Sequence, residues 1–294
     1  MIIGITGATG FLARHVAAAA RSGGHELIGF SRSPRPLAPF REMRPWLPVS
    51  EVNLADIDAL IHLAGESLFG VWSKTRKDRI RSTRVNDTCA LAARFRDGPH
   101  RPAALIAASG AAFYGDRGDE ELTEASPRGQ GFLADVCYGW EAATAEASPP
   151  ARTVSLRTGM VLGHDGGAAP ILGRIFRLAL GGRLGSGKQW MPWIHASDMA
   201  RLCLFAAENH ALNGPVNAVA PGGVTNAQFT RTMASTLHRP AFLPVPAWAL
   251  RLLPGGMHEM FLQSQHIIPA AALNAGFRFL HPDLPSALSD VFSR

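Results

Sequence analysis

Two glycines and an alanine, spaced three residues apart, follow the first apolar segment of the chain: Gly7, Gly10 and Ala13. A turn without side chains lets the backbone approach a phosphate closely, and a helix that starts there offers free N–H groups and the positive end of its dipole. This pattern predicts a site for the diphosphate of a dinucleotide, the alternative being a structural glycine turn without a ligand. The residues expected to hold the diphosphate are Gly7, Thr9, Gly10, Phe11 and Leu12.

The residues after the second apolar segment indicate which dinucleotide is bound. A protein that selects NAD places Asp or Glu there, where the acid bonds the ribose 2′-hydroxyl, but this chain reads Ser31-Arg32-Ser33-Pro34-Arg35. Arg32, supported by Arg35, is suited to a 2′-phosphate through charge-assisted hydrogen bonds. We therefore predict NADP as the cofactor, with Ser31 close to it; an ordinary solvent-exposed loop arginine is the alternative for Arg32.

Alternating strands and helices must position this loop. The apolar run at residues 2–6 predicts a strand, residues 13–21 a helix and residues 26–31 a second strand, which completes one βαβ unit. Later short apolar runs at residues 59–63, 104–108 and 153–156 alternate with helix-length segments at 76–95 and 132–147. The expected fold is α/β, a doubly wound parallel sheet of the Rossmann type. Residues 34–48 are rich in Pro and Arg and are expected to form an irregular connection.

The pattern becomes less regular after residue 163. We expect residues 1–163 to form the NADP-binding domain, with 194–220 returning to it, and residues 164–193 and 221–294 to form a smaller substrate-binding cap. Helices are expected in the later part at residues 170–180, 197–208, 226–237 and 246–253.

Composition excludes several classes of protein. Apolar residues make up 47% of the 294 residues and charged residues 18%, which argues against disorder, and the net charge of +6 is scattered rather than gathered in a basic tract. The three cysteines form no Cys-x-x-Cys pair, no stretch is long enough to span a membrane, and no Cys/His cluster has metal spacing. We expect a cytoplasmic monomer or homodimer that binds a small-molecule substrate and no metal, nucleic acid or membrane.

Several segments together resemble the extended short-chain dehydrogenase/reductases: residues 6–13, residues 61–66, and Ser109 five residues before Tyr114-Gly115-Asp116. More narrowly, the chain resembles the atypical branch known as the NAD-dependent epimerase/dehydratase family, whose C-terminal part is a domain of unknown function. That match rests on Trp72, residues 76–81, 84–85, 114–120 and 132–134, Cys137, residues 140–141, 184–187, 189–191 and 193–195, and the C-terminal segments 226–229 and 239–242.

The resemblance implies further functional positions. It places additional cofactor contacts at Leu63, Ala64, Gly65, Arg84, Gly159 and Met160. It also places His195 and Asp198 at an element boundary, where we expect them to position the sheet edge against the cap rather than to act in catalysis.

The wider superfamily uses a Ser or Thr and a Tyr-x-x-x-Lys motif, in which the lysine lowers the pKa of the tyrosine. Ser109 matches the first element, with a structural serine at a strand end as the alternative, and Tyr138 is the obvious phenol, but Ala142 stands where the lysine is needed. Without a cation the phenol keeps a pKa near 10 and is a weak general base at neutral pH. Cys137 and Glu141 form a second register four residues apart, turned about 100° from Tyr138 on the same helix.

We expect an NADP-dependent oxidoreductase of this atypical type, acting on a small carbonyl or hydroxyl compound, with Ser109 and Tyr138 as the catalytic pair. The missing lysine favours a different class, a cofactor-binding sensor or regulator with little turnover. A sugar-type epimerase, which would cause no net change in NADPH, is the third possibility.

Overall fold

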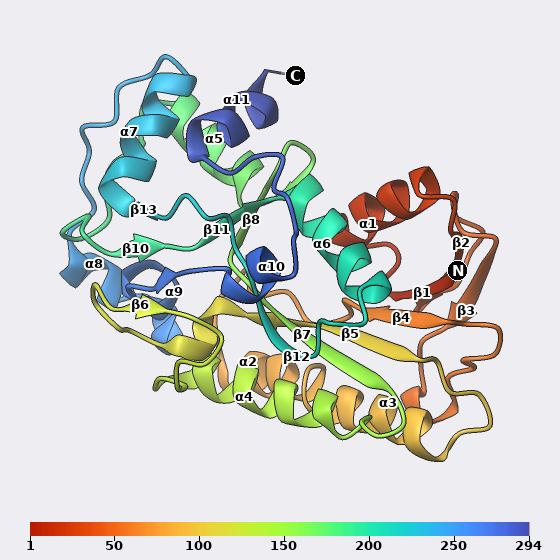
Figure 1. Ribbon diagram of the computed structural model, residues 1–294. Helices are drawn as coiled ribbons and strands as arrows, with labels where there is room; N and C mark the ends of the chain where they lie inside the picture. The colour runs from red at the N-terminus through yellow and green to blue at the C-terminus, as the bar shows by residue number, and fades with distance from the viewer. Residues whose placement is uncertain (294) are drawn as a thin grey trace.

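A seven-stranded parallel sheet forms the centre of the molecule in the computed structural model, which describes residues 1–293 (Figure 1). The strand order is β12-β7-β5-β4-β1-β2-β3, so the direction of winding reverses between β1 and β4. In open α/β sheets such a reversal leaves a crevice at the carboxyl ends of the strands. The strands are β1 (Ile2–Thr6), β2 (Glu26–Ser31), β3 (Glu42–Pro45), β4 (Ala59–His62), β5 (Ala104–Gly110), β7 (Arg152–Thr158) and β12 (Gly214–Ala218).

Helices cover both faces of this sheet. The α1 helix (Phe11–Ser22) and α6 (Ala196–Glu208) pack against each other and bury one face, and α3 (Asn86–Asp97) and α4 (Phe132–Ala145) lie on the opposite face (Figure 1). The strands are therefore apolar on both sides, as parallel strands between two helical layers must be. This arrangement confirms the predicted doubly wound fold.

Two predictions about local structure were wrong. The helix expected over residues 76–95 is divided into α2 (Lys74–Ser82) and α3, because the Thr83 hydroxyl donates to the Arg79 carbonyl, accepts the Glu66 N–H and ends α2. The segment expected to be irregular contains β3, an edge strand beside β2. The Arg44 side chain of β3 is buried and donates to the carbonyl oxygens of Asn53 and Ala55, an internal use of arginine that composition alone does not reveal.

The cap has a second core of its own. Helices α5 (Ala169–Arg177), α7 (Asn226–Thr236) and α11 (Leu284–Phe292) enclose apolar side chains beside the small sheet β11-β8-β9. The remaining elements are β6 (Glu121–Leu122), β8 (Met160–Gly163), β9 (Gly166–Gly167), β10 (Trp190–Met191), β11 (Trp193–His195), β13 (Val224–Thr225), β14 (His266–Ile267), α8 (Ala247–Arg251), α9 (Glu259–Leu262), α10 (Ala270–Asn274), and the 3-10 turns η1 (Val49–Glu51), η2 (Ala111–Tyr114) and η3 (Pro254–Gly256).

The chain crosses between these two cores more than once. After the cap strand β11, α6 and β12 lie with the central sheet, and the chain then returns to the cap at β13. The proposed domain division at residues 163, 194 and 220 stays a prediction. No helix within residues 1–293 is long and apolar enough to cross a membrane.

Candidate functional site

The crevice between β1 and β4 brings the glycine turn close to the loop after β4. Gly7 has φ +66°, and a Cβ atom there would lie 3.2 Å from the Cα atom of Ala64. The Thr6 hydroxyl oxygen accepts the N–H groups of Leu63 and Ala64 at 3.0 and 3.1 Å. The two loops are thus joined by hydrogen bonds and by a contact that only glycine permits, and they form the floor of the crevice.

The first turn of α1 offers free donors to this crevice. Gly10 donates its N–H to the Gly7 carbonyl at 2.8 Å, and the first N–H bonded within the helix belongs to Arg14. In the described part of the chain nothing accepts the N–H groups of Phe11, Leu12 and Ala13, and no side chain caps the helix. These donors and the dipole of a 12-residue helix fit the two phosphates of a dinucleotide.

The space at Gly10 fits the same group. A Cβ atom at Gly10 would meet only the Gly7 carbonyl oxygen, at 3.0 Å, and no other atom within 4 Å. The ring of Phe11 does not enter this space, since it packs against Gly163 and Gly166 of the β8–β9 hairpin. Phe11 therefore presents its backbone to the crevice and its side chain to the cap.

The two arginines after β2 are available for an anion. Arg32 and Arg35 are exposed, and among residues 1–293 neither has a hydrogen-bond or ion-pair partner. Ser31, just before them, is 9% exposed, and its hydroxyl oxygen accepts the Ser33 N–H at 3.3 Å. An arginine without a partner at this strand end suits a 2′-phosphate.

A series of buried hydrogen bonds between side chains lies beneath the floor of the crevice. The Thr6 hydroxyl, which already accepts two N–H groups, donates to Nδ1 of His62 at 2.8 Å, and Nε2 of His62 faces the Thr88 hydroxyl at 3.1 Å. Burial, aided by the positive charge of Arg84, lowers the pKa of His62 to about 4. His62 is therefore neutral at pH 7 and serves to hold Thr6 in place.

A second cluster lies across the carboxyl ends of β5, β7 and β12. The strand register places Ser109, Arg157 and Asn217 side by side, one on each neighbouring strand. Glu141 of α4 completes the cluster. The Ser109 hydroxyl donates to Oε1 of Glu141 at 2.8 Å, and Arg157 donates to both carboxylate oxygens at 2.9 and 2.8 Å.

Arg157 is the centre of this network. Its Nη1 donates to the Tyr114 hydroxyl at 2.8 Å, and that hydroxyl lies 2.7 Å from Oδ1 of Asn217. The guanidinium also stacks on the Phe113 ring, 3.5 Å from its centroid. Burial by itself lowers the pKa of Arg157, but the hydrogen bonds and charge of Glu141 outweigh it and raise that pKa. A charged, bidentate pair results.

Cys137 faces the same cluster. It is 6% exposed, and its sulfur lies against Gly110, where an added Cβ atom would be 3.1 Å from Sγ. Burial and the negative charge of Glu141 raise the pKa of this thiol to about 11, against an opposing effect of Arg84. The thiol is therefore protonated at neutral pH, which makes it a weak hydrogen-bond donor rather than a nucleophile.

Tyr138 points elsewhere. Its side chain is 52% exposed, and its ring packs under the guanidinium of Arg128 at 4.6 Å. The sequence left two faces of α4 as candidates for the site. The face with Cys137 and Glu141 lies toward Ser109, and Tyr138 on the other face is exposed to solvent. The predicted catalytic pair of Ser109 and Tyr138 is thus not brought together in this structure.

The other predicted contacts surround the crevice. The Arg84 guanidinium donates to the Glu66 carbonyl at 2.9 Å, lies near Gly65 and stacks on Trp140 at 5.1 Å. Burial lowers the pKa of Arg84. Gly159 and Met160 follow β7 and donate their N–H groups to the carbonyls of Ala218 and Pro192. No motif singled out Arg157 and Asn217 in the sequence, although both stand near the carboxyl end of a parallel strand, where such residues meet.

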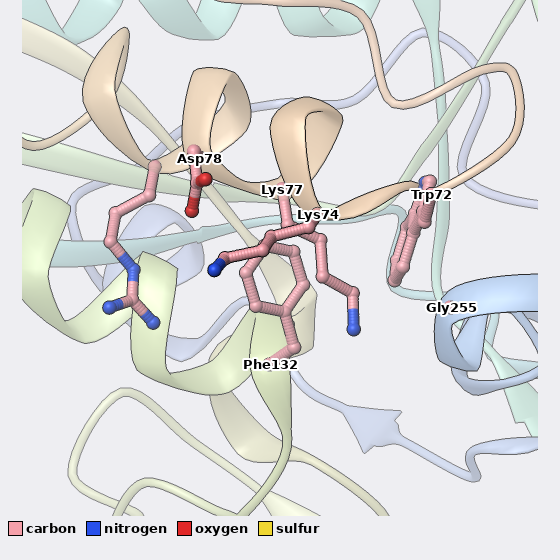
Figure 2. A pocket seen from close by; sticks show the side chains of 7 residues that line it. Trp72, Lys74, Lys77, Asp78, Phe132 and Gly255 are labelled. Carbon is pink, nitrogen blue, oxygen red and sulfur yellow. The ribbon is translucent and has the colours of Figure 1, made fainter.

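A separate pocket of about 460 Å³ lies outside this site, between α2, the first residue of α4 and the η3 turn. Figure 2 shows the side chains of Lys74 and Lys77 beside the Phe132 ring, with Trp72 next to Gly255. Phe132 and Glu141 are nine residues apart on α4, which turns them about 180° from each other. The pocket therefore faces away from Ser109 and contains none of the predicted site residues.

Known proteins are similar to this chain in sequence and in fold. Residues 3–219 match the model of the NAD dependent epimerase/dehydratase family, and residues 245–291 match a domain of unknown function, DUF1731. The epimerase family protein SDR39U1 of Mus musculus is 36% identical over 292 residues, which are 98% of each chain. The epimerase family protein YfhF of Bacillus subtilis is 35% identical over 300 residues, covering 100% of this chain and 98% of the relative.

Two solved structures are similar to this protein in fold. The human epimerase family protein SDR39U1, crystallised with NADPH, superimposes with a TM-score of 0.92 at 33% identity and covers 100% of both chains. A nucleoside-diphosphate sugar epimerase from Corynebacterium glutamicum has a TM-score of 0.80 at 36% identity, covering 98% of this chain and 57% of that one. The match to a family model over most of the chain, with relatives of this similarity, confirms the predicted resemblance: the chain belongs to the NAD-dependent epimerase/dehydratase family.

Proposed function

We propose that this protein binds NADP(H) and transfers a hydride between that cofactor and a small carbonyl or hydroxyl compound. The observation that carries the proposal is the free first turn of α1 near the loop at residues 63–65, together with Arg32 after β2, which has no partner within residues 1–293. The human relative crystallised with NADPH supports this choice of cofactor. In this proposal Gly7, Gly10 and the N–H groups of Phe11 to Ala13 hold the diphosphate, and Arg32 with Arg35 holds the 2′-phosphate.

The nicotinamide, when bound, supplies or accepts the hydride. Because the Ser109 hydroxyl donates to Glu141, its lone pairs are left to accept a hydrogen bond from a substrate hydroxyl. Arg157 donates to both carboxylate oxygens of Glu141 and so holds the carboxylate where the Ser109 hydroxyl reaches it. The protonated Cys137 thiol, which lies against Gly110, is the donor that we assign to a substrate carbonyl oxygen.

One observation favours a second function, cofactor binding with little turnover. Ala142 stands where a lysine would assist the Tyr138 phenol, and the neighbouring Glu141 is already paired with Arg157. The only phenol on α4 faces solvent. A protein of this kind would bind NADPH according to its concentration, and its bound state would regulate a partner.

Three measurements separate these functions. Binding of NADPH and NADH is measured by the fluorescence of the reduced nicotinamide, and absence of NADPH binding would eliminate both proposals. Turnover is then measured with panels of carbonyl and hydroxyl compounds, for the wild type and for Ser109→Ala. Turnover that falls at least tenfold in Ser109→Ala supports the oxidoreductase, and binding without turnover supports the second function. If the substrate is isomerised with no net change in NADPH, the reaction is an epimerisation and not a net oxidation or reduction.

A further inference from the structure

Three potential metal ligands from separate parts of the cap meet where β11 joins α6. His195 ends β11, His281 lies in the loop before α11, and Asp290 lies on α11. One ligand atom from each residue lies within 4.8 Å of the other two. The residues are 86 and nine positions apart along the chain, a spacing that matches no metal-binding motif, so sequence reasoning expected no metal site.

One pair of ligand atoms in the cluster already has the spacing of a zinc site. Nε2 of His195 lies 3.3 Å from Oδ2 of Asp290, and the rings of His195 and His281 have centroids 4.0 Å apart. A charge-assisted hydrogen bond is shorter, about 2.7–2.9 Å. In a tetrahedral zinc site with bonds of about 2.0–2.1 Å, neighbouring ligand atoms are separated by about 3.3 Å. The ligand atoms of His195 and Asp290 stand at that spacing. The His281 ring, which now lies against the His195 ring, would turn to bring its nitrogen to the same ion.

Neighbouring residues hold the two histidines in position. Nδ1 of His195 lies 2.6 Å from the Ser197 hydroxyl, which leaves Nε2 facing Asp290. The fully buried Asp198 accepts the backbone N–H groups of Leu280 and His281, each at 2.8 Å, and so fixes the loop that carries His281. Such outer contacts orient metal ligands in known sites.

We propose that His195, His281 and Asp290 bind one Zn²⁺ ion, with water as the fourth ligand. Two imidazole nitrogens and one carboxylate oxygen are a donor set that zinc accepts in tetrahedral geometry. The Asp290 side chain is 34% exposed, which leaves the cluster open to solvent water and to an incoming ion. The bound ion would fasten the C-terminal helix α11 to the junction of β11 and α6.

Zinc binding would change the proton arrangement on the His195 ring. Without metal, Nδ1 of His195 accepts the Ser197 N–H at 3.2 Å, so the ring proton is on Nε2. When Nε2 binds zinc, this proton moves to Nδ1 and the Ser197 hydroxyl rotates to accept it. The hydrogen bond from the Ser197 N–H to Nδ1 is lost, and the His195 ring keeps its one proton.

The test uses the full chain after treatment with a chelator. Zinc chloride alone is titrated by calorimetry into the wild type, His281→Ala, Asp290→Asn and the control His210→Ala, which removes an exposed histidine outside the cluster. We expect one zinc ion per chain in the wild type and the control, and at least tenfold weaker binding in the two cluster variants, since even changes to residues that orient a ligand cost 10–100-fold. Zinc at 100 times its Kd should also raise the Tm of the wild type by about 5 °C.

Circular dichroism and the Tm of the metal-free variants show whether each variant is folded. Cobalt(II) substitution adds an independent reading, because a thiolate-to-cobalt charge-transfer band would reveal binding at a cysteine instead. The proposal is overturned if the folded His281→Ala and Asp290→Asn variants bind zinc as tightly as the wild type. It is equally overturned if the wild type binds no zinc at micromolar free metal, or if the cobalt spectrum shows a thiolate ligand.

Discussion

The buried pair of Arg157 and Glu141 allows the most quantitative prediction. Arg157→Met keeps most of the side-chain volume but removes every charged contact of the guanidinium. The Arg157 side chain is 4% exposed and Glu141 is 14% exposed, so the carboxylate left behind cannot be hydrated fully. Breaking one partner of a buried pair costs about 3–5 kcal/mol. We therefore expect Arg157→Met to lower the free energy of unfolding by about 4 kcal/mol.

The partner variant should cost less. Glu141→Gln keeps an oxygen that accepts from Ser109 or Arg157. The guanidinium left behind keeps its other contacts, the Tyr114 hydroxyl and the Phe113 ring, so the expected cost is about 2 kcal/mol, in the range of a single hydrogen bond to a charged group. In the double variant no buried carboxylate remains to be desolvated. We expect the double variant to lose about 4 kcal/mol instead of the additive sum of about 6, which is a coupling energy of about 2 kcal/mol.

The assay is urea unfolding followed by circular dichroism and tryptophan fluorescence, with equal slopes required across the variants. The exposed pair Arg117 and Glu120, with side chains 20% and 50% exposed, provides the matched control, for which Arg117→Met and Glu120→Gln should couple by less than about 1 kcal/mol. If the Arg157 and Glu141 variants add within about 0.5 kcal/mol, the reasoning that the two charges depend on each other is refuted.

Three further predictions concern cofactor choice, the phenol on α4 and the response to pH. Arg32→Ala should weaken NADPH binding by about one to two orders of magnitude and leave NADH binding unchanged, because one charged hydrogen bond contributes about 1.5–3 kcal/mol; equal losses for both nucleotides in the fluorescence titration would contradict the assignment. Tyr138→Phe should change neither turnover nor, beyond about 0.5 kcal/mol, stability, since the side chain is half exposed; a tenfold loss of turnover in the steady-state assay would show that the phenol reaches the substrate. Finally, the pKa of His62 is lowered from 6.5 to about 4 in the folded protein, so below pH 6.5 the unfolded chain binds a proton that the folded chain does not. The contribution of His62 to the free energy of unfolding is therefore complete above pH 6.5 and is lost as the pH falls toward 4. The wild type should lose about 2 kcal/mol more stability than His62→Asn between pH 7 and pH 5, and parallel urea-midpoint profiles for the two proteins would disprove this role for the imidazole.

Local patterns were enough to predict the sheet and the cofactor crevice. A glycine turn between an apolar strand and a helix has few other uses, and strands that alternate with helices must run parallel. Two expectations were wrong: an irregular connection over residues 34–48, which contains β3, and a single helix over residues 76–95. Both segments depend on partners distant in sequence. Arg44 is satisfied by the carbonyls of Asn53 and Ala55, and Thr83 by the N–H of Glu66.

The sequence by itself determined the Rossmann framework, the family and the position of the glycine loop, since these follow from short-range periodicity and from motifs within a few residues. The tertiary structure alone decided which face of α4 meets the sheet, because neighbouring helix positions differ by about 100° and both registers carry plausible side chains. It buried Cys137 and Glu141 against Ser109 and left Tyr138 in solvent. It also assembled groups from separate elements, such as Arg157 with Glu141 and His195 with Asp290, whose proximity depends on strand register and helix packing rather than on spacing along the chain.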